Sequence, residues 1–452
     1  MLKRISLLGL LALAPSVHAA PADDTHDEVR TPYNTGLHID DDPATSSSLE
    51  LGVRVGPLGA SKTNILLIIA DDLGADKVTA YQSDVSGYAP AHIPQTTTID
   101  GLASAGLRFT DAWANPVCSP TRAGLFTGRH AHQTGVSGAI PLAPDLSTSE
   151  VSLAEVLHGD TDGDGFRDTL FVNYAIGLFG KWHLGEPGSP VVDYDAAAAT
   201  AACTSPSVEA STANPLLHGW DAFSGGLHGE VSDYWNWVKV SADSTGSTNV
   251  CMETTYATTD TVDEALNWIN AQTGNWMATV SFNAPHTDDN GWSRDHADES
   301  CSTSVANGAA ATSSTIAYQA MAECMDTKIQ TLLDGIPDSE LEDTLIVFIG
   351  DNGTDRAVME DVFATATRGK GTVYESGVRV PFIVVHGQNW LEQRDGEALS
   401  DTLVVSPGRN IGHPVHTTDL FATLADIAHS NGSAGTDSVS FADYLSDPTA
   451  SS

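Results

Sequence analysis

The stretch NILLIIADD, residues 64–72, joins an apolar run directly to two carboxylates. Asn64–Ala70 is short, continuous and apolar, which is typical of a strand buried on both faces of a sheet. Asp71 and Asp72 follow without a spacer. An aspartate pair after one strand is ordinarily a helix cap or a turn, so its meaning depends on whether the pattern recurs.

The pattern does recur along the chain. Three further apolar runs each end in a polar cluster: Tyr174–Phe179 before Gly180-Lys181-Trp182-His183, Met277–Phe282 before Asn283-Ala284-Pro285-His286, and Thr344–Ile349 before Gly350-Asp351-Asn352-Gly353. We expect all three to be buried strands. A last run, Val378–Val385, predicts a strand near a sheet edge, because Pro381 cannot donate a ladder hydrogen bond.

Stretches of helical period lie between these runs: Val262–Ile269, Ala317–Leu333, and Asp419–Ala428 behind Thr417 and Thr418 as candidate caps. Alternating strands and helices predict an α/β fold with a mostly parallel central sheet flanked by helices. Ligands of such sheets bind beyond the carboxyl ends of the strands. Polar clusters in the same topological position therefore predict one convergent site.

Two kinds of side chain meet in this predicted site. The oxygen donors are Asp71, Asp72, Asp351 and Asn352, a hard set that suits Ca²⁺ or Mg²⁺ rather than zinc. The cations and proton-transfer groups are Arg122, Lys181, His183, His286 and Lys370. Each histidine alone is ordinarily a core or surface residue. Together, fixed cations and a divalent metal favour an anionic substrate group.

The N-terminus predicts export. Residues 1–19 have a cationic start at Lys3 and Arg4, a short apolar run and a small-residue cleavage site ending at Ala19, the layout of a secretory signal peptide. We therefore expect a periplasmic or secreted protein, with residues 20–60 as an extended lead. No later apolar run reaches membrane length, and a formal charge of −39 disfavours nucleic acid and anionic membranes as partners.

The chain has five cysteines, and an odd number leaves one unpaired in an oxidising compartment. Pairs 203/251 and 301/324 would close local loops, although sequence alone does not determine the connectivity. Cys118 would then be the unpaired residue. It stands where a helix begins, with Pro120 in the first turn, and helix N-termini attract anions.

The motifs resemble the type I, formylglycine-dependent sulfatases of the alkaline phosphatase superfamily, and arylsulfatases in particular. Cys118-Ser119-Pro120-Thr121-Arg122, continuing to Thr127-Gly128, is similar to the family signature Cys-x-Pro-x-Arg followed by Thr-Gly. Other family motifs follow in chain order: ADDLG at 70–74, GKWHLG at 180–185, APHTD at 284–288, GDNGT at 350–354 and GKGTVYESGVRVP at 369–381.

This resemblance implies hydrolysis of aryl or carbohydrate sulfate esters. Cys118 would be oxidised by a formylglycine-generating maturation enzyme, and the aldehyde hydrate would attack sulfur. The implied Ca²⁺ ligands are Asp71, Asp72, Asp351, Asn352 and the modified residue 118. The resemblance further implies that Arg122 and Lys181 stabilise the hydrate with His183 beside them, and that His286 and Lys370 face the sulfate ester.

The resemblance leaves two rival functions open: a phosphate or phosphonate ester hydrolase on the same scaffold, and an inactive anion-binding relative. Residues 61–430 form the expected catalytic domain, and residues 431–452 the truncated start of a C-terminal region. Ser376 replaces a glycine of the family's Glu-Gly-Gly, from which we expect a local turn adjustment. The segment Asp160–Asp168 is either a second, structural Ca²⁺ loop or a solvated acidic turn.

Overall fold

The computed structural model describes residues 63–84, 92–159, 174–185, 214–245, 247–288, 301, 313–359, 368–396, 402–428, 430, 436–447 and 449. The predicted signal peptide, the lead segment and the candidate calcium loop Asp160–Asp168 lie outside these ranges. Among the described residues, no helix has the length and apolarity needed to cross a membrane.

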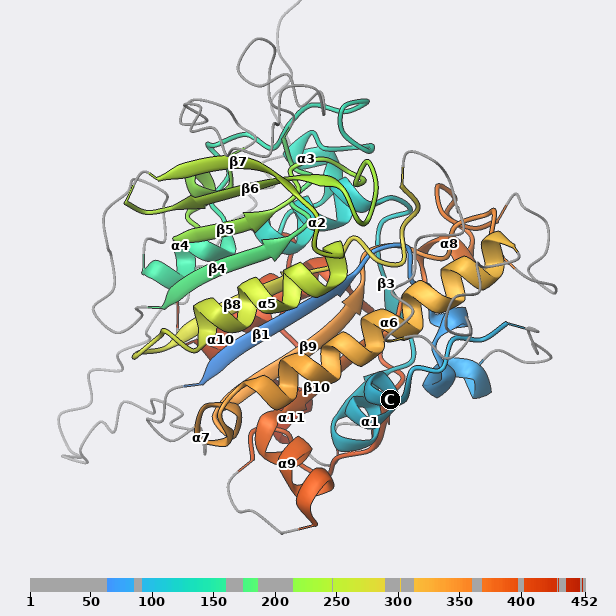
Figure 1. The fold of residues 1–452 in the computed structure, drawn as a ribbon. Helices are drawn as coiled ribbons and strands as arrows, with labels where there is room; N and C mark the ends of the chain where they lie inside the picture. The colour runs from blue at the N-terminus through green and yellow to red at the C-terminus, as the bar shows by residue number, and fades with distance from the viewer. Residues whose placement is uncertain are drawn as a thin grey trace, which may run out of the picture. The chain divides into compact units, whose positions relative to one another are not determined.

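A 10-stranded sheet forms the centre of the described fold, in the order β11-β2-β10-β9-β1-β8-β4-β5-β6-β7 (Figure 1). Its strands are β1 (Asn64–Ala70), β2 (Leu107–Phe109), β4 (Ala175–Gly180), β5 (Ala222–Gly225), β6 (Trp237–Asp243), β7 (Thr248–Glu253), β8 (Trp276–Ser281), β9 (Thr344–Gly350), β10 (Phe382–His386) and β11 (Arg409–Ile411). A separate parallel pair joins β3 (Ala112–Trp113) to β12 (Val415–His416).

The α/β class and the four strands that precede polar clusters are confirmed, and the sheet is mixed, with a parallel centre and antiparallel strands on both sides of it. The central strands β9, β1, β8, β4 and β5 are parallel to their neighbours in this group. In contrast, β10 runs antiparallel to both β9 and β2, and β5, β6 and β7 form an antiparallel meander. The predicted runs did not include β6 and β7, whose residues are only partly buried.

Strand β10 is the third strand from one end of the sheet, near an edge as expected, but Pro381 does not lie inside it. Strand β10 begins at Phe382 and has hydrogen-bonded neighbours on both sides. Pro381 directly precedes the strand, and its carbonyl oxygen accepts a bond of 3.1 Å from the N–H of Gly350. Because only the proline's acceptor is used, its missing donor costs the ladder nothing.

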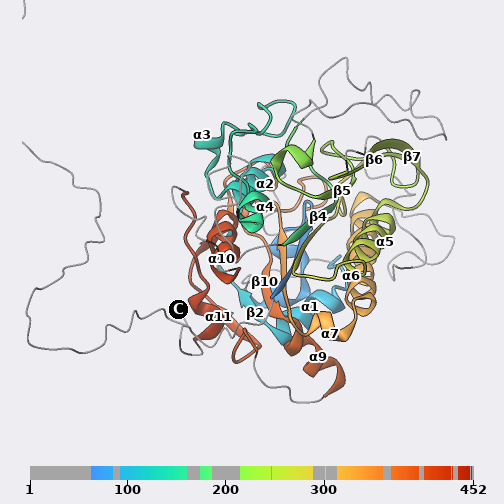
Figure 2. The ribbon, with the colours of Figure 1, turned by 90° about the vertical axis from the view of Figure 1, so that its left-hand side faces the viewer.

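Helices cover both faces of the sheet, as Figure 2 shows. One face carries α1 (Thr97–Ala105), α5 (Ala257–Ile269), α6 (Ser314–Gly335), α7 (Asp338–Leu341) and α9 (Gly387–Asp395), and the other carries α2 (Cys118–Thr127), α4 (Leu153–His158), α10 (Leu420–Ile427) and α11 (Asp443–Ser446). The short helices α3 (Ala131–Thr134) and α8 (Glu375–Val378) lie in loops, and 3₁₀ turns span Ala75–Lys77, Thr79–Asp84, Pro215–His218 and Thr417–Asp419.

The apolar side chains of β1 alternate between two cores. Ile65, Leu67 and Ile69 belong to the cluster under α2, α4 and α10, whereas Leu66 and Ile68 belong to the cluster under α1, α5 and α6. Successive side chains of a strand point to opposite faces, so a continuous apolar run is needed when both faces are covered.

Thr417 and Thr418, the predicted caps of α10, do not cap it: its N-cap residue is Asp419, which makes no side-chain capping bond there, and a 3₁₀ turn capped by His416 leads into the helix. Thr417 and Thr418 lie inside a 3₁₀ turn, and the His416 side chain accepts from the N–H of Thr418. Asp419 completes the capping box by accepting from the N–H of His416 at 2.8 Å. A histidine side chain can accept in this way only in the neutral tautomer that leaves a lone pair on the ring nitrogen.

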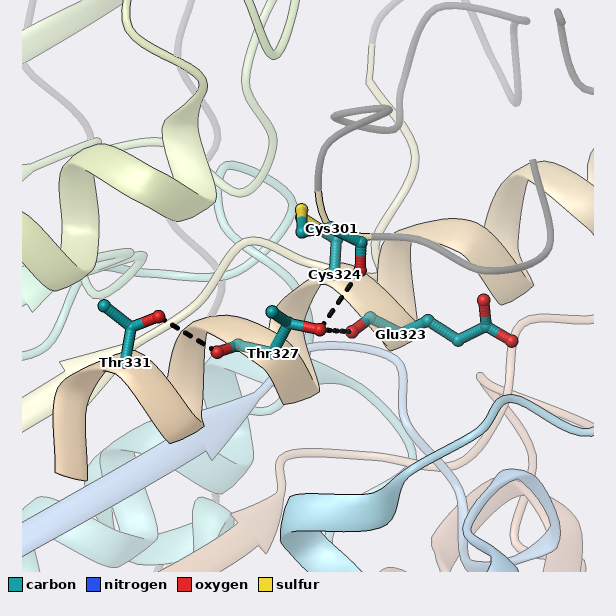
Figure 3. Close-up of a disulfide and its surroundings, with 5 residues drawn as sticks. All are labelled: Cys301, Glu323, Cys324, Thr327 and Thr331. Atoms are coloured by element: carbon teal, nitrogen blue, oxygen red, sulfur yellow. Dashed lines mark hydrogen bonds between the residues drawn. A yellow bond between two sulfur atoms is a disulfide. The ribbon is translucent and has the colours of Figure 1, made fainter. Parts of the chain in front are cut away.

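One predicted disulfide is confirmed. Cys301 and Cys324 are bonded, and Figure 3 shows the bond beside α6, where Thr327 also donates to the carbonyl oxygen of Cys301. Cys251 is disulfide-bonded as well, and Cys203, its expected partner, lies outside the described residues. Cys118 is the free cysteine of the described chain, as the odd count predicted.

Residues near the C-terminus pack on the same core. Phe441 and Leu445 are buried in the cluster under α10, and the N–H of Val405 donates to Leu445. The predicted boundary between the catalytic domain, residues 61–430, and a C-terminal region from residue 431 stays a prediction.

Candidate active site

The predicted polar clusters meet at the carboxyl ends of the central strands. Strands β9, β1, β8 and β4 are consecutive and parallel, so their carboxyl ends lie side by side (Figure 1). Asp71, Lys181 and Asp351 each follow one of these ends directly or within one residue. The parallel centre of the sheet therefore gathers side chains that are up to 280 positions apart in the sequence.

Cys118 is the first residue of α2 and is buried. Its Sγ lies 3.1 Å from Nδ1 of His183. Burial raises the pKa of the Cys118 thiol, and Lys181 and Lys370 only oppose this shift. A thiol with a raised pKa is protonated at neutral pH and is a poor nucleophile as it stands.

His183 is held in one orientation by a backbone acceptor. Its Nε2 lies 2.8 Å from the carbonyl oxygen of Ile140. A carbonyl can only accept, so Nε2 carries the proton and Nδ1 presents its lone pair to Cys118. Burial, aided by Lys181, lowers the pKa of His183 well below its ordinary value, which keeps the ring neutral.

The backbone around His183 is specialised for this placement. His183 has a φ of 56°, in the left-handed region that non-glycine residues seldom occupy. A Cβ on Gly229 would lie 2.5 Å from the Cε1 atom of His183, so only glycine leaves room for the ring. Asp72, with a φ of 62°, is the other site residue in this region.

Arg122 is fully buried and all of its bonds are internal. Its Nε and Nη2 donate to Oδ2 of Asp351 at 3.0 and 2.9 Å, and its Nη1 donates to the carbonyl oxygen of Lys181 and to Ser281. The carboxylate of Asp351 raises the pKa of Arg122 although burial opposes it. Arg122 therefore orients a carboxylate of the site and ties α2 to β4 and β8.

Two lysines pair with the aspartates that end β1. Lys181 Nζ contacts Oδ2 of Asp71, and Lys370 Nζ lies 2.6 Å from Oδ1 of Asp72. Although burial would lower the pKa of Lys370, the facing carboxylate of Asp72 raises it above the ordinary value. His286 is more exposed, and its Nε2 lies 3.8 Å from Oδ2 of Asp72.

Several buried oxygens of the site have no hydrogen-bond partner among the described residues. Those without a hydrogen bond are Oδ1 of Asp71, Oδ2 of Asp72, for which His286 at 3.8 Å is too distant, and Oδ1 of Asn352. A buried polar atom without a partner costs free energy, so such atoms are rare unless a ligand satisfies them. Three unsatisfied oxygen donors in one cluster fit a bound hard cation.

Carboxylate geometry supports the same interpretation. Ligand atoms of Asp71, Cys118 and Asp351 lie within 4.8 Å of one another, and so do those of Asp71, Asp72 and His286. Asn352 contacts the second group, because its Nδ2 donates to Oδ1 of Asp72 at 2.7 Å. The second group contains a residue, His286, that the sequence assigned to the substrate rather than to the metal.

Residues that the sequence analysis did not single out support the site. Ser281 Oγ accepts from Arg122 and donates to the carbonyl oxygen of Lys181. Tyr234 donates to the carbonyl oxygen of His286, and Tyr318 donates to that of Asp72, at 2.8 and 2.9 Å. Both tyrosines come from outside the motifs, and nothing in their local sequence distinguishes them from core aromatic residues.

Comparison with known proteins gives a consistent result. The sulfatase family model matches residues 63–430. Arylsulfatase A of Bos taurus is 39% identical over 145 residues, which cover 30% of this chain and 24% of that protein. An arylsulfatase of Hemicentrotus pulcherrimus is 26% identical over 378 residues, covering 81% of this chain and 58% of the other. The chain thus spans less than two thirds of the length of either relative.

A solved structure supports the fold. Ps i-CgsB in complex with k-i-k-neocarrahexaose aligns with a TM-score of 0.58 and 23% identity, covering 82% of this chain and 73% of that one. At this identity the likeness extends to the fold alone.

Proposed function

The chain belongs to the sulfatase family, and from this premise we propose that it hydrolyses sulfate esters of aromatic alcohols or saccharides. The observation that carries the proposal is the contact between the buried Cys118 and His183. Three ion pairs of the same site accompany it: Arg122 with Asp351, Lys181 with Asp71, and Lys370 with Asp72. The two relatives described above are arylsulfatases, and the aligned solved structure holds a saccharide. These names support the two substrate classes.

We assign the nucleophile to Cys118 after conversion to formylglycine by a maturation enzyme. The free, protonated thiol would be a poor nucleophile, and the residue heads a match to the family signature. In the structure its Sγ occupies the position that oxygen would take in the converted residue. Hydrated formylglycine supplies two hydroxyl groups on one carbon, one to attack sulfur and one to assist release of sulfate.

The surrounding side chains divide the proton and charge handling. His183, neutral and with Nδ1 facing residue 118, would accept a proton at that atom. Arg122 and Lys181 would stabilise negative charge beside residue 118, because both side chains are fully buried in the site, out of reach of water. His286 and Lys370 together would neutralise the sulfate ester and protonate the departing alcohol.

We propose Ca²⁺ as the metal, held by Asp71, Asp72, Asp351 and Asn352 together with residue 118. The unsatisfied oxygens of Asp71, Asp72 and Asn352 support this assignment, since each needs a partner that the described chain does not provide. When bound, the cation would neutralise the acidic cluster and the sulfate oxygens. The N-terminal signal layout supports function in the periplasm or outside the cell.

Two measurements on the purified protein test this function. Intact mass should lie about 18 Da below that of the unmodified, signal-cleaved chain, because sulfur and two hydrogens are exchanged for oxygen. Initial rates on an aryl sulfate should exceed those on the matched aryl phosphate. A large preference for phosphate would establish the phosphate ester hydrolase instead, and an unconverted, inactive protein would indicate an anion-binding relative.

A further inference from the structure

Two exposed arginines lie beside the loop that carries Lys370. Arg356 and Arg368 are exposed, and the described residues contain no carboxylate within ion-pair distance of either guanidinium group. Two other surface arginines are paired with carboxylates: Arg129 with Glu150 and Arg394 with Asp338. In a chain with 59 acidic and 20 basic residues, unpaired cations at one place are unexpected.

Both guanidinium groups are held in position by this loop. Nε of Arg356 donates to the carbonyl oxygen of Lys370 at 2.8 Å, and a Cβ on Gly371 would lie 3.0 Å from its Nη2. The guanidinium of Arg368 lies over the ring of Tyr374, 5.1 Å from the centroid. A cation stacked on an aromatic ring loses less freedom when it binds a ligand.

The loop itself is fastened to the catalytic centre. The N–H of Gly371 donates to the carbonyl oxygen of Pro116, two residues before Cys118, and the N–H of Lys370 donates to Thr354. Ser376 Oγ donates to the carbonyl oxygen of Arg368 at 2.9 Å. Ser376, the residue at which the chain departs from the family motif, thus binds the backbone of Arg368; the expected adjustment of the turn stays a prediction.

From these contacts we infer that Arg356 and Arg368 form a second anion subsite beside the scissile sulfate. The inference rests on the proposed function and deepens it: the preferred substrate carries a further sulfate or carboxylate on the same saccharide. Planar guanidinium groups bind such oxyanions with paired hydrogen bonds. Their placement within a strongly acidic chain would attract a polyanionic saccharide to the one position where it reacts.

The test compares matched monosulfated and disulfated disaccharides. The wild-type protein should favour the disulfated one in kcat/KM by about tenfold, and Arg356→Ala/Arg368→Ala should lose this preference through a higher KM. Arg368→Ala alone, which leaves the bond from Arg356 to Lys370 in place, should keep activity on a simple aryl sulfate within about twofold of wild type. Arg394→Ala, which removes a surface cation from α9 near the opposite ends of the strands, should keep the preference.

A binding measurement separates failure of this inference from failure of the proposed function. By calorimetry, the Cys118→Ala variant should bind the disulfated disaccharide more tightly than the monosulfated one. Adding Arg356→Ala and Arg368→Ala to this variant should abolish the difference in Kd between the two sugars. Equal binding of both sugars, or an arginine variant that loses both sugars equally, would overturn the subsite. Tight, arginine-dependent binding without sulfate release by the wild type would instead retain the subsite and contradict the hydrolase.

Discussion

At the scale of single residues, the site depends on what surrounds Cys118. Burial raises the pKa of the thiol, while His183 remains neutral and points its lone pair at Sγ. The pairing suits a residue that is first converted and then exchanges protons with the histidine.

Replacing Cys118 by serine should separate attack from release. The introduced serine hydroxyl can attack sulfur once, but it has no second hydroxyl on the same carbon to expel the sulfate. We expect Cys118→Ser to gain about 80 Da and to release at most one alcohol per molecule, measured by intact mass and by burst kinetics. Sustained turnover by this variant would contradict the hydrate mechanism.

The metal assignment predicts a thermal shift that depends on Asp351. Calcium at about 100 times its Kd should stabilise the wild-type protein by about 2.7 kcal/mol, because the ion binds only the folded state. Asp351→Asn should lose most of this shift together with activity, as followed by calorimetry with and without a chelator. Since Asp351 also holds Arg122, the effect of calcium on each protein must be compared, rather than their absolute melting temperatures. Full wild-type activity in chelator would rule the metal out.

At the scale of secondary structure elements, α1 is capped by a residue from another helix. Its own N-cap residue, Thr96, makes no capping bond, and Asp326 of α6 accepts from the N–H groups of Thr98 and Ile99 at 2.9 and 2.8 Å. Burial raises the pKa of Asp326 to about 6 despite these bonds. The first turn of α1 therefore depends on correct docking of α6.

This contact predicts a pH-dependent stability. The pKa of Asp326 is raised in the folded state, so the protonated carboxyl group contributes to the free energy of unfolding. This contribution is fully present below the unfolded pKa of about 4 and is lost as pH rises through about 6. Asp326→Asn should accordingly destabilise the protein more at pH 5 than at pH 7, by about 1 kcal/mol in the free energy of unfolding. A substitution cost that is equal at both pH values would contradict the raised pKa.

The elements also show where sequence patterns are reliable. The strand Asn64–Ala70 was predicted with its observed bounds because a strand covered on both faces must be apolar throughout. Strands β6 and β7 carry a weaker signal since they are the last two strands at one end of the sheet and are only partly buried. The start of β10 could not be derived, because a proline before a strand and a proline inside one have the same sequence signature.

At the scale of the whole molecule, charge opposes folding. A formal charge of −39 produces self-repulsion in the compact state, which dissolved salt screens. We expect sodium chloride at fixed free calcium to raise the melting temperature between low and physiological ionic strength, by about 2 °C for each kcal/mol gained. Unchanged or lower stability in salt would mean that local ion pairs outweigh the repulsion.

The sequence by itself determined which residue types are present and where along the chain they occur: oxygen donors, cations and one odd cysteine, most of them placed after an apolar strand or in the first turns of a helix. These features are local, so they can be recognised without knowing the fold. Only the tertiary structure decided which residues are partners. His183 faces Cys118, and Arg122 forms an ion pair with Asp351. Two exposed arginines, Arg356 and Arg368, are held by the loop that carries Lys370. Partnership depends on strand order and on loops that approach one another across hundreds of residues, and those distances follow from packing rather than from any local pattern.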